Sequence, residues 1–182
     1  MSSIIKVNTY QDANGNALFS SDGSGNVTLT NFPDNTPAFV ARMSATQNIS
    51  NNVETLVNFD TEIFDDDGVF DNSSGNYKFT VPSGQAGKYS IYGRVLLDSQ
   101  SAANMQNCQM ILYKNGAKHE YNYWNFNSND ILACTVEIQS ILDLSVGDYI
   151  QMYAKINDAS GSPRFDYDEK ISRFSGFKLI GA

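Results

Sequence analysis

Thr135-Val136-Glu137-Ile138-Gln139 places apolar residues at alternate positions, with polar or charged residues between them. This period of two is typical of a half-buried β-strand, because successive side chains of a strand point to opposite faces. Cys108-Gln109-Met110-Ile111-Leu112 follows the same rule, with apolar residues at its even positions. No segment keeps helical spacing over about 11 residues. These patterns predict strands rather than helices.

Further strands are expected where β-branched and aromatic residues lie between turn signals. Asn14-Gly15, Asp22-Gly23, Asp67-Gly68 and Asn115-Gly116 supply the positive φ that tight hairpin turns require. The strands expected from these signals cover residues 76–82, 88–97, 108–113, 132–138, 148–156 and 174–180. Short strands at regular spacing predict an all-β fold, an antiparallel two-sheet sandwich or jelly roll.

Composition excludes several classes of function. The chain has 182 residues with 12 Lys+Arg against 20 Asp+Glu, so its net charge is -8. An acidic chain without a basic stripe repels phosphate, so we expect no nucleic-acid binding. No run of about 18 apolar residues is present, so we expect no membrane insertion. The start, Met1 to Lys6, lacks the apolar region of a secretory signal, and we expect synthesis in a reducing compartment.

The sequence offers few groups for catalysis or transition-metal binding. His119 is the single histidine, and we expect an ordinary polar position for it. Cys108 and Cys134 lack zinc-site spacing, and each is in register with the apolar residues of its strand. They are therefore expected to be buried free thiols, since a disulfide needs Cα atoms within about 7 Å and an oxidising compartment. No nucleophile elbow, HExxH, Walker A or GxGxxG pattern is present, so we expect no enzymatic activity.

The first 36 residues differ from the rest. Asp12-Ala13-Asn14-Gly15-Asn16-Ala17 is similar to Asp22-Gly23-Ser24-Gly25-Asn26-Val27, which follows at an interval of ten. Each copy predicts a tight turn followed by a short strand, at 17–19 and 27–29. Two copies are fewer than the three or so that a repeat stack needs, so this arm is expected to take stability from its own copies in an oligomer or from a larger partner. Phe32-Pro33-Asp34-Asn35-Thr36-Pro37 marks the expected boundary between a 1–36 arm and a 37–182 domain.

From Pro37 onward the chain resembles the C1q-like domain, a jelly roll related to the tumour-necrosis-factor fold. The ordered aromatic signature of that family is matched by Phe59, Asp65, Phe70, Phe79, Gly87 and Tyr89. Lys114-Asn115-Gly116 is similar to the family's hairpin, and Leu144-Ser145-Val146-Gly147-Asp148 to its Leu-x-x-Gly-Asp segment. Phe174-Ser175-Gly176-Phe177 resembles its closing strand. The resemblance implies an antiparallel two-sheet jelly roll and a homotrimer.

The arm suggests a setting for this domain. Its Gly-Asn-Ala and Asp-Gly-Ser-Gly-Asn-Val-Thr turns resemble segments near the start of tail-fibre and other virion proteins of marine tailed bacteriophages. The resemblance implies a virion structural or attachment protein, assembled in the bacterial host cytoplasm. Its expected partners are its own copies, other virion proteins through residues 1–36, and a glycan or protein of the host surface. The alternative is a soluble C1q-like recognition module that binds glycan or protein ligands.

A run of carboxylates is the densest charge feature of the sequence. It comprises Asp60, Glu62, Asp65, Asp66, Asp67 and Asp71. Several oxygen ligands could hold Ca²⁺, although the run does not fit the EF-hand template. Some C1q-like trimers carry Ca²⁺ near their axis, but the resemblance assigns no ligands here. The other interpretation is a solvated acidic loop in which Asp65 shapes the turn.

The candidate binding residues are Tyr121, Tyr123, Trp124 and Phe126, in the stretch Tyr121-Asn122-Tyr123-Trp124-Asn125-Phe126-Asn127. Aromatic faces with neighbouring amides could stack on a sugar or on a partner surface. The same alternation also suits a strand that packs a trimer interface or covers the end of a barrel. The sequence leaves both interpretations open.

Overall fold

The structure, a computed structural model, describes residues 7–29, 35–100, 102–126 and 129–180. All regular secondary structure in these ranges consists of β-strands, and every strand pairing is antiparallel. This confirms the predicted all-β class. The chain divides into two compact units, one within residues 1–34 and one within 35–180. Phe32 to Asp34 of the expected boundary lie outside the described residues. The described residues include no helix long and apolar enough to span a bilayer.

The first unit is a meander of three strands, β1 (Thr9–Gln11), β2 (Ala17–Ser21) and β3 (Val27–Leu29). The repeated turns precede β2 and β3, as predicted. In each turn one aspartate accepts a side-chain hydrogen bond from the asparagine four residues on, Asp12 from Asn16 at 2.9 Å and Asp22 from Asn26 at 2.6 Å. None of the side chains described between residues 7 and 28 is buried. This unit therefore has no hydrophobic core of its own among its described residues.

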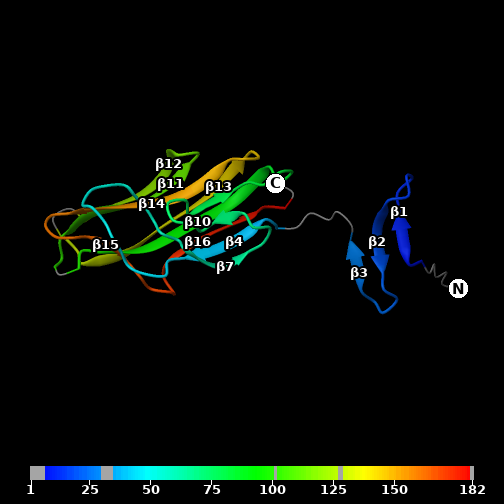
Figure 1. Cartoon of the computed structure of the whole chain (residues 1–182), viewed down its shortest axis with the longest axis horizontal. Helices are drawn as coiled ribbons and strands as arrows, with labels where there is room; N and C mark the ends of the chain where they lie inside the picture. The colour runs from blue at the N-terminus through cyan, green and yellow to red at the C-terminus, as the bar shows by residue number, and fades with distance from the viewer. Residues whose placement is uncertain (1–6, 30–34, 101, 127–128, 181–182) are drawn as a thin grey trace. The chain divides into compact units, whose positions relative to one another are not determined.

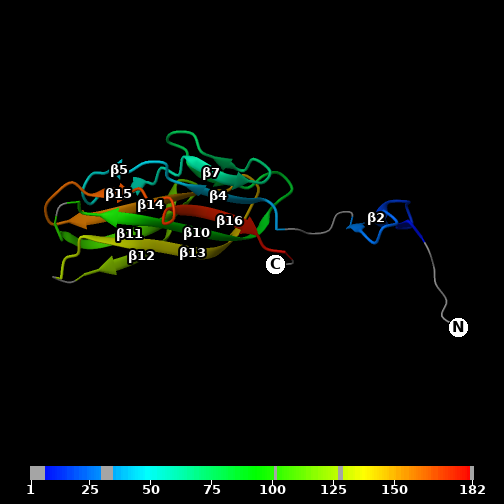
Figure 2. The same ribbon diagram turned by 90° about the horizontal axis from the view of Figure 1, so that it is seen from below.

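The second unit packs two sheets face to face (Figures 1 and 2). The β10 sheet runs β7-β4-β16-β10-β13. β15 also pairs with β10, and β5 pairs with β15. Its strands are β4 (Ala38–Arg42), β5 (Gln47–Asn48), β7 (Thr61–Asp65), β10 (Gly87–Asp98), β13 (Ala133–Leu144), β15 (Arg164–Asp166) and β16 (Arg173–Lys178). The β11 sheet runs β12-β11-β14-β9-β8, and β6 also pairs with β14. Its strands are β6 (Thr55–Leu56), β8 (Phe70–Asp71), β9 (Lys78–Thr80), β11 (Met105–Lys114), β12 (Ala117–Asn125) and β14 (Tyr149–Asp158).

All six strands predicted in this unit are confirmed, as β9, β10, β11, β13, β14 and β16. The clearest difference is the length of β13, which continues to Leu144 instead of ending at residue 138. Its alternation persists beyond Ile138, with buried Leu142 and Leu144 on the inner face and exposed Ile141 on the outer face. β13 pairs with β10 along the whole length of both strands, so its register is fixed from end to end.

Aromatic rings fill the space between the sheets. The Phe39 ring of β4 stacks on Phe70 and Phe79 of the opposite sheet, with centroid distances of 5.0 and 5.1 Å. Phe174 of β16 meets Phe39 edge-on at 5.0 Å. Phe59 and Tyr89 extend the same cluster. Each such ring pair stabilises the fold by about 0.5–1.5 kcal/mol beyond the contribution of the apolar area that it buries. The aromatic residues of the signature therefore join the two sheets.

Gly176 lets β16 approach this cluster closely. A Cβ at this position would lie 2.7 Å from Ile91 Cδ1 and 2.9 Å from Phe39 Cε1, and 3.3 Å from the backbone oxygen of Ser90. Ile91 and Phe39 are buried in the close-packed core, so moving either side chain away would cost free energy. The Phe-Ser-Gly-Phe segment therefore needs glycine for steric reasons.

Gly176→Ala is expected to lower the free energy of unfolding by about 1–3 kcal/mol, because the added methyl group overpacks the core. Urea denaturation followed by tryptophan fluorescence measures the change. Ser175→Ala, on the neighbouring and partly exposed position of the same strand, is the matched control and should change stability by less than about 0.5 kcal/mol. Equal stability of Gly176→Ala and the wild type would contradict the steric explanation.

Candidate functional site

The strand β12 carries three of the four candidate binding residues, and its register with β11 divides them between two faces. Tyr121 lies opposite Ile111 and Tyr123 opposite Gln109, whereas Trp124 lies opposite Cys108. Directly opposed residues of an antiparallel pair point to the same face. Cys108 belongs to the core between the sheets, so Trp124 lies on the inner face of β12 and the two tyrosines lie on the outer face.

These side chains differ in exposure as well. Tyr121, Tyr123 and Trp124 are 57%, 45% and 51% exposed. Phe126, just after β12, packs against the core instead. The structure thus brings Tyr121 and Tyr123 together on one surface, directs Trp124 to the other face, and gives Phe126 a packing role.

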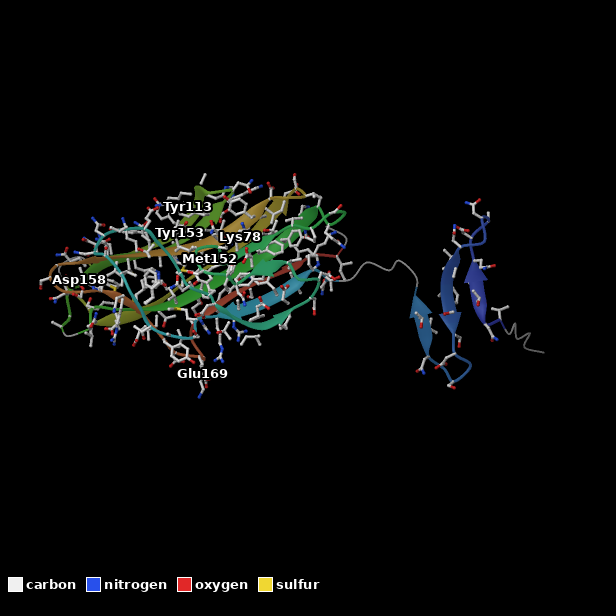
Figure 3. All side chains as sticks on the ribbon, viewed as in Figure 1. Lys78, Tyr113, Met152, Tyr153, Asp158 and Glu169 are labelled. Carbon is white, nitrogen blue, oxygen red and sulfur yellow. The ribbon has the colours of Figure 1, made fainter. Side chains whose placement is uncertain are left out.

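Tyr121 belongs to a polar aromatic group that we call the tyrosine cluster, formed by Glu54, Tyr113, Lys118, Tyr121 and Tyr153 (Figure 3 labels Tyr113 and Tyr153). The Lys118 ammonium lies 4.5 Å from the centroid of the Tyr121 ring and donates to Glu54 Oε1 at 2.6 Å. The Tyr113 hydroxyl donates to Glu54 Oε2, and the Tyr113 ring stacks on Tyr153 at 4.1 Å. The cluster presents ring faces, a cation and a carboxylate on one surface.

The charges of the tyrosine cluster are fixed by these hydrogen bonds. Those from Lys118 and Tyr113 lower the pKa of Glu54. The same bond to Glu54, together with burial, raises the pKa of Tyr113 to about 12. At neutral pH Glu54 is therefore ionised and Tyr113 keeps its proton.

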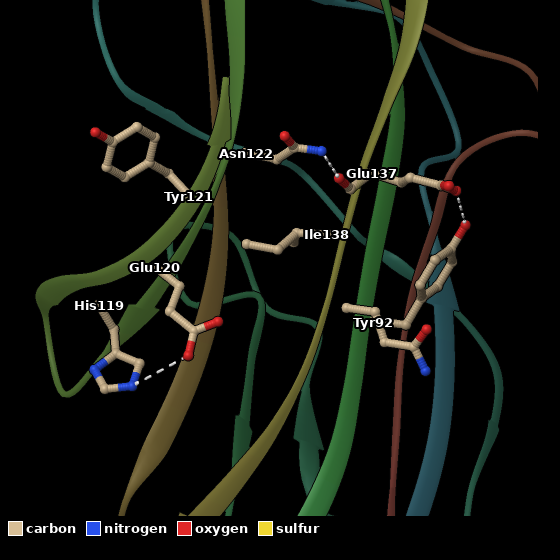
Figure 4. Close-up of a pocket in the computed structure, with 8 residues that line it drawn as sticks. Tyr92, His119, Glu120, Tyr121, Asn122, Glu137 and Ile138 are labelled. Atoms are coloured by element: carbon tan, nitrogen blue, oxygen red, sulfur yellow. Dashed lines mark hydrogen bonds and ion pairs between the residues drawn. The ribbon is translucent and has the colours of Figure 1, made fainter. Parts of the chain in front are cut away.

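A groove of about 550 Å³ lies between β12 and β13, where the two sheets approach each other (Figure 4). Its lining residues are Tyr92, His119, Glu120, Tyr121, Asn122, Glu137, Ile138 and Gln139. The Asn122 side-chain amide donates to the backbone oxygen of Glu137 at 3.0 Å and joins the sheets. The Tyr92 hydroxyl donates to Glu137 Oε2 at 2.6 Å, and burial with this bond raises the pKa of Tyr92. Figure 4 shows Tyr121 pointing away from Asn122 and Glu137.

The groove offers hydrogen-bonding groups and carboxylates. His119 Nε2 lies 3.7 Å from Glu120 Oε1, and both side chains are largely exposed. Such a groove suits recognition of polar or cationic groups. Tyr92, Glu120 and Glu137 were not singled out from the sequence, because they come from three strands that only the fold brings together. Alternation with buried neighbours was the available signal for Tyr92 and Glu137, whereas both neighbours of Glu120 are exposed.

The acidic stretch uses several of its carboxylates to hold its own backbone. Asp65 accepts from the amides of Val69 and Phe70, both at 3.0 Å, which confirms that it shapes this turn. Asp60 accepts from the amide and hydroxyl of Ser44, and Asp71 from Ser73. Within the described ranges, no group of three or more His, Cys, Asp or Glu side chains is placed to hold a metal ion.

Glu54→Gln is expected to destabilise the protein by about 1 kcal/mol at pH 7, because Lys118 and Tyr113 lose the ionised carboxylate that accepts their hydrogen bonds. The effect is modest because these side chains are partly exposed. The pKa of Glu54 in the folded state lies below its ordinary value of 4.5. Ionised Glu54 therefore stabilises the folded state above about pH 4.5, and this stabilisation is lost as the pH falls through the lowered pKa. The difference between Glu54→Gln and the wild type should therefore shrink below about pH 4.5. Urea denaturation at pH 7 and at stepwise lower pH measures it, with Glu120→Gln as the exposed control. A difference that is the same at every pH would contradict this role of Glu54.

Comparison with known proteins agrees with this architecture. Among solved structures, the globular domain of zebrafish complement 1qA protein matches with a TM-score of 0.53 and 17% identity, over 80% of this chain and 98% of that chain. At this identity the likeness concerns the fold, and it confirms the predicted C1q-like jelly roll. The comparison with curated proteins gives no match. The sequence model of the C1q domain matches residues 38–179, which is well over half of the chain. The chain belongs to the C1q domain family.

Proposed function

We propose that the chain is a non-enzymatic, homotrimeric virion structural protein of a bacteriophage, with a C1q domain displayed for host contact or particle stabilisation and anchored through residues 1–36. The observation that carries the assembly is an uncovered apolar surface on the β10 sheet. Phe64, Phe177 and Ile141 are 46%, 41% and 64% exposed. Exposed apolar groups that gather on one surface mark interaction sites.

Strand register places these side chains on one face. One row of directly opposed residues runs Phe64, Val40, Ser175, Tyr92 and Gln139, and the next runs Ala38, Phe177, Ser90 and Ile141. The neighbour of Val40, Phe39, is in the core, so both rows lie on the outer face of the β10 sheet. The face is hollowed beside Phe64 and Phe177 by about 340 Å³, where Ala38, Val40 and Ser175 contribute small side chains. We call it the β10 face.

A threefold ring requires two different surfaces on each copy, because its contacts are heterologous. The β10 face is the first. The inner side of β12, with Trp124, Asn122 and Glu120, is the second, and Trp124 is exposed in the isolated chain. Arg94 and Arg173 lie directly opposite each other on the β10 face, and Glu137 lies directly opposite Arg94 on that same face. Glu120 lies on the β12 side of the groove. The opposite charges of Arg173 and Glu120 favour a contact between the two surfaces in neighbouring copies.

The first unit supports anchoring. Val7, Leu18 and Val27 are exposed, and Tyr10 stacks on Phe19 at 4.2 Å without any buried residue beneath them. A sheet of this kind gains stability when its apolar groups are covered by other chains. Copies of the same unit or another virion protein would cover them. The virion assignment is tested by the genes beside this one: capsid and tail genes support it, and an unrelated chromosomal neighbourhood contradicts it.

Phe177→Asp is expected to convert the trimer into monomers at micromolar concentration, because a charge buried without a partner destabilises an interface by about 3 kcal/mol or more. Size-exclusion chromatography with light scattering gives the mass. Val146→Asp, in the exposed turn between β13 and β14, is the control and should remain trimeric. A wild type that is monomeric under these conditions would overturn the trimer proposal.

A second candidate function, recognition of glycan or protein ligands by a soluble module, is favoured by the tyrosine cluster. Tyr121→Ala combined with Tyr123→Ala is expected to weaken binding to host cells or arrayed glycans about tenfold, since each stacked aromatic contributes about 0.5–1.5 kcal/mol and about 1.4 kcal/mol corresponds to a tenfold change in affinity. Tyr167→Ala, a partly exposed tyrosine after β15, is the control. Absence of binding by the full-length wild type to any host surface favours a purely structural role.

A further inference from the structure

Three sulfur atoms meet between β11 and β13. Cys108 Sγ of the β11 sheet lies 3.6 Å from Cys134 Sγ of the β10 sheet. The Met105 Sδ lies 3.7 Å from Cys134 Sγ. Cys108 and Met105 are fully buried, whereas Cys134 is partly exposed. Neither cysteine is used by the tyrosine cluster, the groove or the β10 face.

The backbone holds the two thiols in this position. Met105 and Ile131 form an antiparallel bridge, with amide-to-carbonyl distances of 3.0 and 3.2 Å. Cys108 follows Met105 by three residues on β11, and Cys134 follows Ile131 by three residues near the start of β13, so both cysteines lie close to this bridge. A disulfide has an S–S length of about 2.05 Å, so bond formation needs the sulfurs to approach by only about 1.5 Å. Side-chain rotation supplies movements of this size.

The two thiols are not equivalent. Cys108 is closed off from solvent, so an external reagent can reach only Cys134. A hydrogen bond from the Cys108 thiol lowers the pKa of Cys134. The same hydrogen bond and burial raise the pKa of Cys108. Because the thiolate is the nucleophile, exposure and acidity both favour first attack by Cys134.

We propose that Cys134 and Cys108 form a reactive dithiol, a modification site for low-molecular-weight disulfides such as oxidised glutathione, with Cys134 as the attacking thiol and Cys108 as the resolving thiol. Cys134 Sγ attacks one sulfur of the small disulfide, whose S–S bond breaks, and one small thiol leaves with a proton. Cys108 Sγ then loses its proton and attacks Cys134 Sγ, and the second small thiol leaves. The two protein thiols are oxidised by two electrons, and one small disulfide is reduced to two thiols.

The product joins the two sheets beside the groove. It closes the loop that contains all of β12, together with its connections to β11 and β13. A covalent link between distant residues restricts the unfolded chain and thereby stabilises the folded state. Oxidation is therefore expected to raise the denaturant midpoint of the C1q domain and to hold β12 against β13.

The test incubates the full-length protein with oxidised glutathione in the presence of a metal chelator and follows its intact mass. The wild type is expected to lose two hydrogen atoms and to retain no glutathione. Cys108→Ser should stop at the first step and keep one glutathionyl group on Cys134. Cys134→Ser should stay unmodified, since Cys108 is buried. Cys108→Ala is the second variant in case a buried hydroxyl prevents folding, and circular dichroism confirms the fold of each protein.

Three results would overturn the proposal. The first is a wild type that keeps a stable glutathionyl group, which means that Cys108 does not resolve it. The second is modification of folded Cys134→Ser as fast as that of Cys108→Ser. The third is an oxidised wild type whose urea midpoint does not exceed that of the reduced protein. Cys108→Ala under the same two conditions serves as the control that cannot form the disulfide.

Discussion

The stacking of Phe39 on rings from the opposite sheet is the contact on which the rest of the larger unit depends. Phe39 belongs to β4, yet it touches Phe70 and Phe79 across the sandwich and Phe174 beside it. Asp65 holds the backbone amide of Phe70, so an acidic residue of the turn positions a ring of the core. Gly176 keeps β16 close enough for the rings to meet. A change to any of these residues would alter the separation of the sheets, since rigid rings leave little room for adjustment.

The edge formed by β12 and β13 is held together differently from the aromatic end. A hydrogen bond from Asn122 to the Glu137 backbone and the contact between Cys108 and Cys134 cross the sandwich there. Among the strands that the structure describes, β12 pairs only with β11, so one of its edges is open there. The groove and the exposed tyrosines lie where core packing does not decide the choice of residue, whereas Cys108 of the thiol pair belongs to the core. An edge of this kind is free to serve binding and assembly.

The sequence predicted the parts of the fold that rest on local patterns. Alternation around Val136 and Ile138 located β13, and the ordered residues from Phe59 to Tyr89 indicated the C1q-like fold, whose core their rings form. The tyrosine cluster could not be predicted, because Glu54 and Tyr113 meet only through the pairing of β6 and β11 with β14. Alternation separates Tyr121 from Trp124, but which of them faces the core depends on the register of β12 with β11, which shifts at the bulge between Leu112 and Tyr113. Both cysteines were expected to be buried free thiols; both are free, but only Cys108 is buried and Cys134 is partly exposed. Nothing in the spacing of residues 108 and 134 reveals that they lie near one backbone bridge.

Alternation along β12 reconciles the two interpretations that the sequence left open. Trp124 and Asn122 point toward the side of β13, where a neighbouring copy would pack against the groove. Tyr121 and Tyr123 point to the outer face of the β11 sheet, and Tyr121 also lines the groove. A ring built on the β10 face would leave Tyr123 accessible. A single strand of period two can therefore contribute to assembly with one set of side chains and to ligand contact with the other. On this view the dithiol at Cys134 acts on both, because a bond that holds β12 against β13 stabilises the strand that presents both sets.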